Sequence, residues 1–151
     1  HIYKKDFLNH IQQPITIENT KMTPKVLRDT YEYRDESHVQ SNCIKTYIEH
    51  KDTCIISLRD ENDKRITNEF IPMGKDKKMV NVQSRTRFNG VALGTHLQPF
   101  IEQLNLKMKK ACKEGIYKKN QVIKECKLTG KLQDVKSRGR YNYGMIEDLP
   151  F

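Results

Sequence analysis

Three short runs in the middle of the chain have the hydrophobic pattern of β-strands. The run TCIISLR is rich in β-branched residues, RITNEFI alternates after the polar stretch DENDK, and MVNVQ alternates again after a Pro and a Gly. Runs of this kind, separated by polar turn residues, are typical of antiparallel hairpins. We therefore predict a small three-stranded antiparallel meander with strands at 53–59, 65–71 and 79–84.

Helical patterns lie on both sides of this meander. Pro24 follows a threonine that could serve as N-cap, and Ser37 with Gln40 matches the S-x-x-Q capping box. In the second half, apolar residues recur three or four positions apart from Leu97 to Ala111 and form one stripe. These signals predict helices at 24–36, 37–50, 96–113 and 117–126.

The length of 151 residues suits one domain. We place it at 1–127 with an α+β architecture of helices before and after the meander, and expect residues 128–151 to form a basic extended tail. No apolar run approaches the roughly 20 residues that span a bilayer, and no signal peptide opens the chain. We therefore expect a cytoplasmic protein that does not enter a membrane. Because the first residue is His1 rather than Met, we also expect a fragment or a processed product.

The charge is distributed unevenly along the chain. Residues 1–72 carry 11 Lys and Arg against 12 Asp and Glu, whereas residues 73–151 carry 17 against 7, within a net charge of +9. A basic half of this kind indicates DNA or RNA as partner, with solubility alone as the other explanation. The residues that we expect to contact nucleic acid are Lys75, Lys77, Lys78, Arg85, Arg87, Phe88, Lys107, Lys110, Lys118, Lys119, Arg138 and Arg140.

The segment SRTRFNG directly after the third predicted strand is the centre of this expectation. Two arginines beside a phenylalanine are a common way to hold a single strand, since the aromatic ring stacks on a base. The alternative is that Phe88 belongs to the core and the arginines to the solvent.

Arg59, Glu69 and Gln83 form a candidate chemical cluster across the three predicted strands. If the first hairpin folds about residues 62–63, Arg59 pairs near Thr67 and lies diagonally about 7 Å from Glu69. We expect the three side chains on one side of the sheet with Cβ atoms within about 12 Å of one another. The plain alternative is a solvent-exposed ion pair.

The other side of the third strand, with Val80 and Val82, is expected to pack against the helix at 96–113. Cys43 is expected to be buried on its helix, and it would need thiolate character to act as a nucleophile. The four cysteines form no C-x-x-C pair, which favours a reduced compartment. The spacing of the His and Cys residues at 38–54 matches no common zinc site, so we predict no metal there.

Taken together, the pieces SNCIKTYI, DTCIISLRD, ITNEF and VNVQSRTRFN resemble the PcfJ-like family, proteins of plasmid-transfer operons and phages. The match covers roughly residues 36–110. The chain has Asn42 where the family usually has His, lacks a Gly near position 46, and has one additional residue before its asparagine. The residues that match the family pattern are Cys43, Tyr47, Arg59, Thr67, Glu69, Gln83, Arg85 and Asn89.

The resemblance implies a mobile-genetic-element setting and a polar site formed by Cys43, Arg59, Glu69, Gln83 and Asn89, without a settled activity. Three hypotheses stay open. The first is a nucleic-acid-binding domain. The second is an enzyme acting on nucleic acid or a phosphate ester, in which Glu69 would be general base or ligand of a divalent metal; no other cofactor is expected. The third is a subunit of a larger assembly, docked through residues 141–151.

Overall fold

The computed structural model describes residues 1–50, 52–117 and 119–120. Its centre is a six-stranded antiparallel sheet in which the strands follow one another in sequence order, β2-β3-β4-β5-β6-β7. The strands are β2 (Ile15–Ile17), β3 (Thr20–Val26), β4 (Cys54–Arg59), β5 (Arg65–Met73), β6 (Lys78–Thr86) and β7 (Gly90–Val91).

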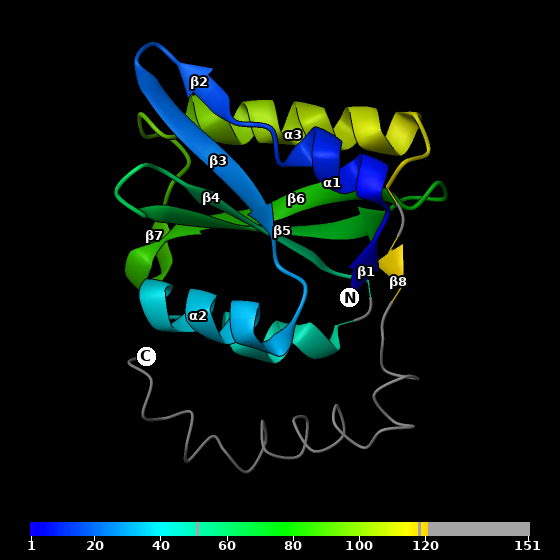
Figure 1. The fold of residues 1–151 in the computed structure, drawn as a ribbon, viewed down its shortest axis with the longest axis horizontal. Coiled ribbons are helices and arrows are strands. Elements are labelled where there is room, and N and C mark those ends of the chain that lie inside the picture. Colours follow the sequence, from blue (N-terminus) through cyan, green and yellow to red (C-terminus); the bar gives the residue numbers. More distant parts are fainter. Residues whose placement is uncertain (51, 118, 121–151) are drawn as a thin grey trace.

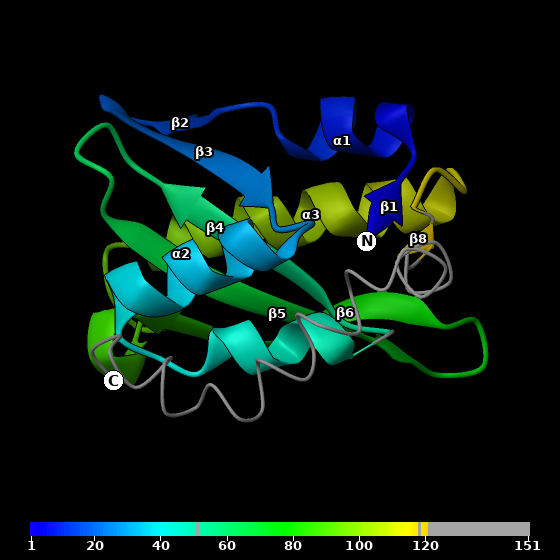
Figure 2. The same ribbon diagram turned by 60° about the horizontal axis from the view of Figure 1, so that its bottom comes forward.

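Helices cover both faces of this sheet, so the described part of the chain has three layers (Figure 1). One face carries α1 (Lys5–Ile11) and α3 (Gln98–Lys113), and the other carries α2 (Thr30–Gln40) and the 3₁₀ helix η1 (Ile44–Glu49). A second view, with the lower side turned forward, shows α2 and η1 side by side in front of the sheet (Figure 2). The remaining short elements are β1 (Ile2–Tyr3), which pairs with β8 (Lys119–Asn120), and the 3₁₀ turn η2 (Arg87–Asn89).

The two faces of the sheet differ in polarity. Even-numbered residues of β4 belong to the large apolar cluster with α1 and α3, whereas Ile55 belongs to a small cluster with Leu27, Tyr33 and Ile44. The α2 side also buries polar side chains, among them Glu36 and Gln40. The face under α2 therefore holds charged as well as neutral polar side chains in fixed positions.

The α+β class is confirmed, but the sheet is not the predicted three-stranded meander, since it has six strands. The strands predicted at 53–59, 65–71 and 79–84 are found as β4, β5 and β6. The helix predicted at 96–113 is found as α3. Among the described residues no helix has the length and apolar character needed to cross a membrane.

The helix predicted at 24–36 is wrong in its first half. Pro24 lies in β3, beyond the residues that pair with the short β2, so its missing N–H removes no bond to that strand. The helix begins at Thr30 instead, because Asp29 is its N-cap and accepts a hydrogen bond from the backbone N–H of Glu32 at 2.9 Å.

The helix predicted at 37–50 is also wrong. Ser37 and Gln40 form the last turn of α2, which ends where Ser41 turns into the left-handed region with φ 51°. Cys43 is consequently exposed instead of buried on a helical stripe. Within the helix predicted at 117–126, Lys119–Asn120 form β8; the rest of it and the predicted tail at 128–151 lie outside the described residues.

Candidate functional site

The strand register brings polar side chains of β4, β5 and β6 to the face under α2. Glu69 lies opposite Ile55 on one side and opposite Gln83 on the other, and Thr67 lies opposite Arg85. Directly opposite residues in an antiparallel pair point to the same face. This face therefore carries Thr67, Glu69, Gln83 and Arg85 as a contiguous polar patch.

A pocket of about 430 Å³ opens over this patch. Its floor is the sheet, and its wall is formed by the residues that link α2 to η1 together with the first part of η1. The lining residues are Thr67, Glu69, Gln83 and Arg85 of the sheet, Asn42, Cys43, Ile44 and Tyr47 of the wall, and Asn89 of η2.

Glu69 is held in place by its cross-strand neighbour. Gln83 Nε2 donates to Glu69 Oε1 at 2.8 Å. Because a carboxylate only accepts hydrogen bonds, this contact also determines which way the Gln83 amide points. The second carboxylate oxygen of Glu69 has no hydrogen-bond partner among the described residues, so it is free to bind a group in the pocket.

Arg85 is the cationic member of the lining. It lies opposite Thr67 and therefore diagonal to Glu69 across the β5–β6 pair, a relation with roughly 7–8 Å between the two positions. Its guanidinium forms no ion pair with any described residue, Glu69 included. The pocket thus contains one carboxylate and one guanidinium that do not neutralise each other by contact.

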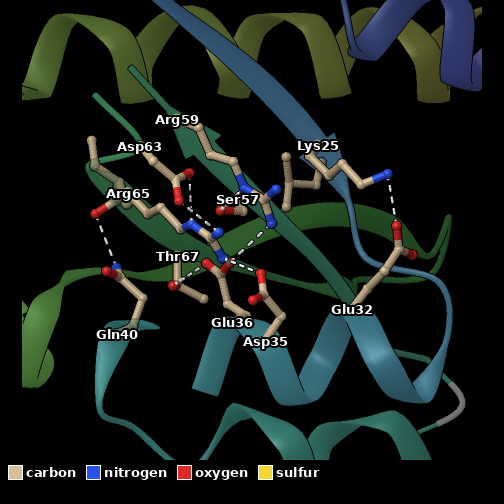
Figure 3. Close-up of polar contacts among 12 residues, drawn as sticks. Lys25, Glu32, Asp35, Glu36, Gln40, Ser57, Arg59, Asp63, Arg65 and Thr67 are labelled. Atoms are coloured by element: carbon tan, nitrogen blue, oxygen red, sulfur yellow. Dashed lines mark hydrogen bonds and ion pairs between the residues drawn. The ribbon is translucent and has the colours of Figure 1, made fainter. Parts of the chain in front are cut away.

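A buried ion-pair network adjoins the pocket at Thr67 (Figure 3). Glu36 of α2 is fully buried and accepts from Arg65 Nη1 at 2.9 Å, from Arg59 Nη2 at 3.3 Å and from Thr67 Oγ1 at 2.6 Å. Gln40, one helical turn later, donates to the backbone carbonyl of Arg65 at 2.9 Å. These contacts hold α2 on the sheet through polar groups.

Arg65 is the most heavily paired cation of this network. Burial acts to lower its pKa, but hydrogen bonds to Asp63 and Asp35 and the charge of Glu36 outweigh it, so the pKa of Arg65 lies above its usual value. In return, the hydrogen bonds from Arg65 hold the pKa of Asp63 below its usual value. Both arginines of this network, Arg59 and Arg65, are committed to structural partners.

Four of the five predicted site residues share the pocket, namely Cys43, Glu69, Gln83 and Asn89. Arg59 does not line it. The hairpin register differs by two residues from the predicted one, so Arg59 lies opposite Arg65 rather than Thr67. Its strand position is therefore about 13 Å along the sheet from that of Glu69, and the predicted diagonal contact between them is wrong.

The prediction that Val80 and Val82 pack against the helix at 96–113 is wrong as well. A bulge in β6 places Glu69 opposite Gln83 but Phe70 opposite Asn81, which leaves Val82 as an extra residue. Asn81 therefore faces α3 and donates to Asn105 Oδ1 at 3.0 Å. Val80 and Val82 are 42% and 45% exposed.

The residues predicted to contact nucleic acid do not form one surface. Lys75, Lys77 and Lys78 lie at or beside the β5–β6 turn, whereas Arg85, Arg87 and Phe88 lie at the other end of the nine-residue β6, about 25 Å away. Lys107 and Lys110 belong to α3, on the opposite face of the sheet from the pocket, and Lys119 belongs to β8. Lys118, Arg138, Arg140 and the proposed docking segment 141–151 lie outside the described residues.

Phe88 does not belong to the core. Its side chain is 68% exposed, and its backbone has φ 60°, in the left-handed region that bulky residues rarely adopt. The guanidinium of Arg87 lies 4.9 Å from the centre of its ring. An exposed aromatic and a cation therefore stand beside the pocket, between its lining residues Arg85 and Asn89.

Sequence reasoning missed Glu36 and Arg65. The signal for Glu36 was the composition of α2, TYEYRDESHVQ, which has too few apolar residues for a hydrophobic stripe and must dock through polar ones.

Within 1–50, 52–117 and 119–120, no three His, Cys, Asp or Glu side chains are grouped as a metal site. Comparison of the chain with protein-family models, curated proteins and solved structures finds no match.

Proposed function

We propose that the chain is a nucleic-acid-binding domain of a mobile-element or phage-type protein, and that the pocket together with η2 is its binding centre. The observation that carries this proposal is Phe88, an exposed aromatic with a strained backbone and a stacked arginine at the mouth of a polar pocket. A left-handed backbone at a bulky residue costs about 1–3 kcal/mol and is common at ligand-binding sites.

The side chains at η2 and beside the pocket are suited to bind single-stranded nucleic acid. A base that stacks on an exposed aromatic gains about 1–3 kcal/mol, whichever base it is. Arg87 directly precedes Phe88 and lies against its ring, so a phosphate next to a stacked base can meet a cation. The lysines at the β5–β6 turn and on α3 are too far away to contribute to this centre.

The resemblance to the PcfJ-like family gains support from the pocket. Seven of the eight residues that match the family pattern line it, although they are spread over 47 positions from Cys43 to Asn89. The eighth, Arg59, reaches the pocket only through Glu36, which also accepts from Thr67. A pattern whose members converge on one pocket is what a binding or catalytic site requires.

The test is the salt dependence of binding to a short oligothymidylate, measured by fluorescence anisotropy. Each phosphate that a single strand pairs with a cation contributes about 0.7 to the slope of log affinity against log salt. Phe88→Ala is expected to weaken binding by about 5- to 150-fold, the range that corresponds to one lost stacking contact.

Tyr31→Ala is the matched control, because Tyr31 is also an exposed aromatic but lies at the start of α2, away from the pocket. Its affinity should equal that of the unmodified chain. An affinity that does not change with salt, or an equal loss in both variants, would refute the proposed centre.

A second candidate is an enzyme that acts on nucleic acid or a phosphate ester, favoured by the presence of Cys43, Glu69 and Gln83 in one pocket. Glu69 would serve as general base and Arg85 would stabilise an anionic transition state; Arg59 has no place in this mechanism. Cleavage of a labelled strand that Glu69→Gln abolishes and Glu61→Gln retains would support it. Equal cleavage by both variants would exclude Glu69 as the base.

A further inference from the structure

We propose that the pocket takes one guanine base, with the carboxylate of Glu69 and the guanidinium of Arg85 bound to different groups on the edge of the same ring. This inference rests on the proposed nucleic-acid-binding function and names the ligand of the same site.

The first observation is an unpaired carboxylate and an unpaired cation in diagonal positions. β4, β5 and β6 carry three arginines. Arg59 and Arg65 have carboxylate partners at 3.3 Å or less, whereas Arg85 has none among the described residues. Long side chains at diagonal positions can reach each other, but Glu69 and Arg85 form no ion pair. The space between them leaves room for a ligand that binds both.

The second observation is the chemistry that the pocket offers. Glu69 presents acceptors only, with one oxygen entirely free and the other already bound by Gln83 Nε2 at 2.8 Å. Arg85 presents donors only. The complementary ligand has an acceptor at one end and donors at the other, all in one rigid plane.

Guanine matches this arrangement among the common bases. Its Watson–Crick edge carries the O6 acceptor followed by two adjacent donors, N1–H and the 2-amino group. Adenine and cytosine each combine one amino donor with a ring-nitrogen acceptor, which a carboxylate repels, and thymine has a single donor between two acceptors. A carboxylate that accepts from N1–H and the 2-amino group, with an arginine on O6, therefore selects guanine.

The pocket has the size and the walls for a base. Its volume of about 430 Å³ lies within the range of small-molecule sites. Tyr47 of η1 lines it as an aromatic wall, and Ile44 adds an apolar surface. Proteins that read single-stranded bases combine contacts to the Watson–Crick edge with stacking on aromatic and apolar side chains.

The experiment compares guanine with hypoxanthine, which lacks only the 2-amino group. The chain is titrated with oligothymidylates that contain one central guanosine or one central inosine, and separately with free guanosine and inosine monophosphates by calorimetry. We expect the guanine ligand to bind about 10- to 150-fold more tightly than its hypoxanthine counterpart, the range that corresponds to one lost hydrogen bond to a charged group. The ratio is measured within one protein sample, so a partly unfolded variant does not distort it.

Glu69→Gln should abolish this discrimination, because its amide replaces one acceptor oxygen by an NH2 donor, which opposes the donors of guanine. Glu61→Gln removes the same charge from the exposed β4–β5 turn and should retain it. A preference for guanine over hypoxanthine in the oligonucleotide upholds the proposal. If the free nucleotides show the same preference, the site also takes guanine outside a strand; if they do not, it takes guanine only within a strand. Equal binding of guanine and hypoxanthine in both formats overturns it while salt-dependent strand binding persists. If no oligonucleotide binds, the proposed function fails, and the free nucleotides alone decide the inference.

Discussion

Glu36 is expected to be the most sensitive charged position of the chain, and Glu36→Gln tests this. The substitution keeps the size of the side chain but removes the negative charge that Arg59 and Arg65 share. These two arginines lie directly opposite each other on β4 and β5, so without Glu36 two like charges face each other, which is destabilising in a sheet.

The magnitude follows from burial and from the partners that remain. Breaking a buried ion pair by removal of one partner costs about 3–5 kcal/mol. Arg65 keeps the carboxylates of Asp35 and Asp63, and the Arg59 side chain is 22% exposed and partly solvated. We therefore expect the lower end, about 3 kcal/mol of unfolding free energy, or a fall in Tm of about 6–12 °C for a chain of this size.

Urea denaturation followed by far-UV circular dichroism measures this loss, since the chain has no Trp to report unfolding by fluorescence. Glu102→Gln, on the exposed side of α3, is the matched control and should change stability by less than about 0.5 kcal/mol. The double variant Glu36→Gln with Arg59→Gln should recover part of the loss, because it removes one of the two facing cations. A loss below about 1 kcal/mol, or no recovery in the double variant, would refute the view that α2 is held to the sheet by charge.

Three further predictions concern the same fold. The pKa of Asp63 is lowered by its hydrogen bonds from Arg65, so its contribution is complete above the unfolded pKa and is lost as pH falls through the lower folded pKa; Asp63→Asn should reduce the acid loss of stability in urea titrations between about pH 5 and pH 2. Cys43 is exposed and Cys54 is fully buried, so iodoacetamide should label Cys43 in the native protein and Cys54 only after unfolding, as peptide mass spectrometry can show. Asn68→Ala should cost about 2–3 kcal/mol in urea unfolding, because the fully buried Asn68 donates to two backbone carbonyls of the sheet.

Elements with a continuous apolar signal could be predicted from the sequence. β4 is a β-branched run that is buried on both faces, and α3 presents one apolar stripe to the sheet. In both, the residues that define the element also bury it, so local pattern and tertiary structure agree. The same agreement is absent from α2, whose docking residues are charged or amide side chains and have no hydrophobic period.

The segment around Pro24 shows why a local signal can mislead. A threonine before a proline is a good helix start, but it is also compatible with an extended strand. The outcome was decided by β4, which lies 30 residues later and pairs with Thr23–Val26. No pattern within the segment itself contains that information.

The sequence predicted which face of the sheet each site residue lies on better than it predicted which residues it contacts. The register of the β4–β5 hairpin differs by two residues from the prediction, and a two-residue shift keeps every side chain on its face while it changes every cross-strand contact. Arg59, Glu69 and Gln83 accordingly share a face, yet only the last two touch. The bulge at Val82 had the opposite effect, because one extra residue reverses the faces of the positions before it.

The resulting sheet face is divided at Thr67 into a closed half and an open half. On the closed side, Glu36 accepts from Arg59, Arg65 and Thr67 with its two oxygens, so these contacts hold α2 on the sheet. On the open side, Glu69 and Arg85 keep unused hydrogen-bonding groups in a pocket. Both side chains are half-buried, and neither has an ion-pair partner among the described residues. A ligand that binds both can therefore use hydrogen-bonding groups that the fold leaves open, which is the physical reason to look for function in the open half and for stability in the closed one.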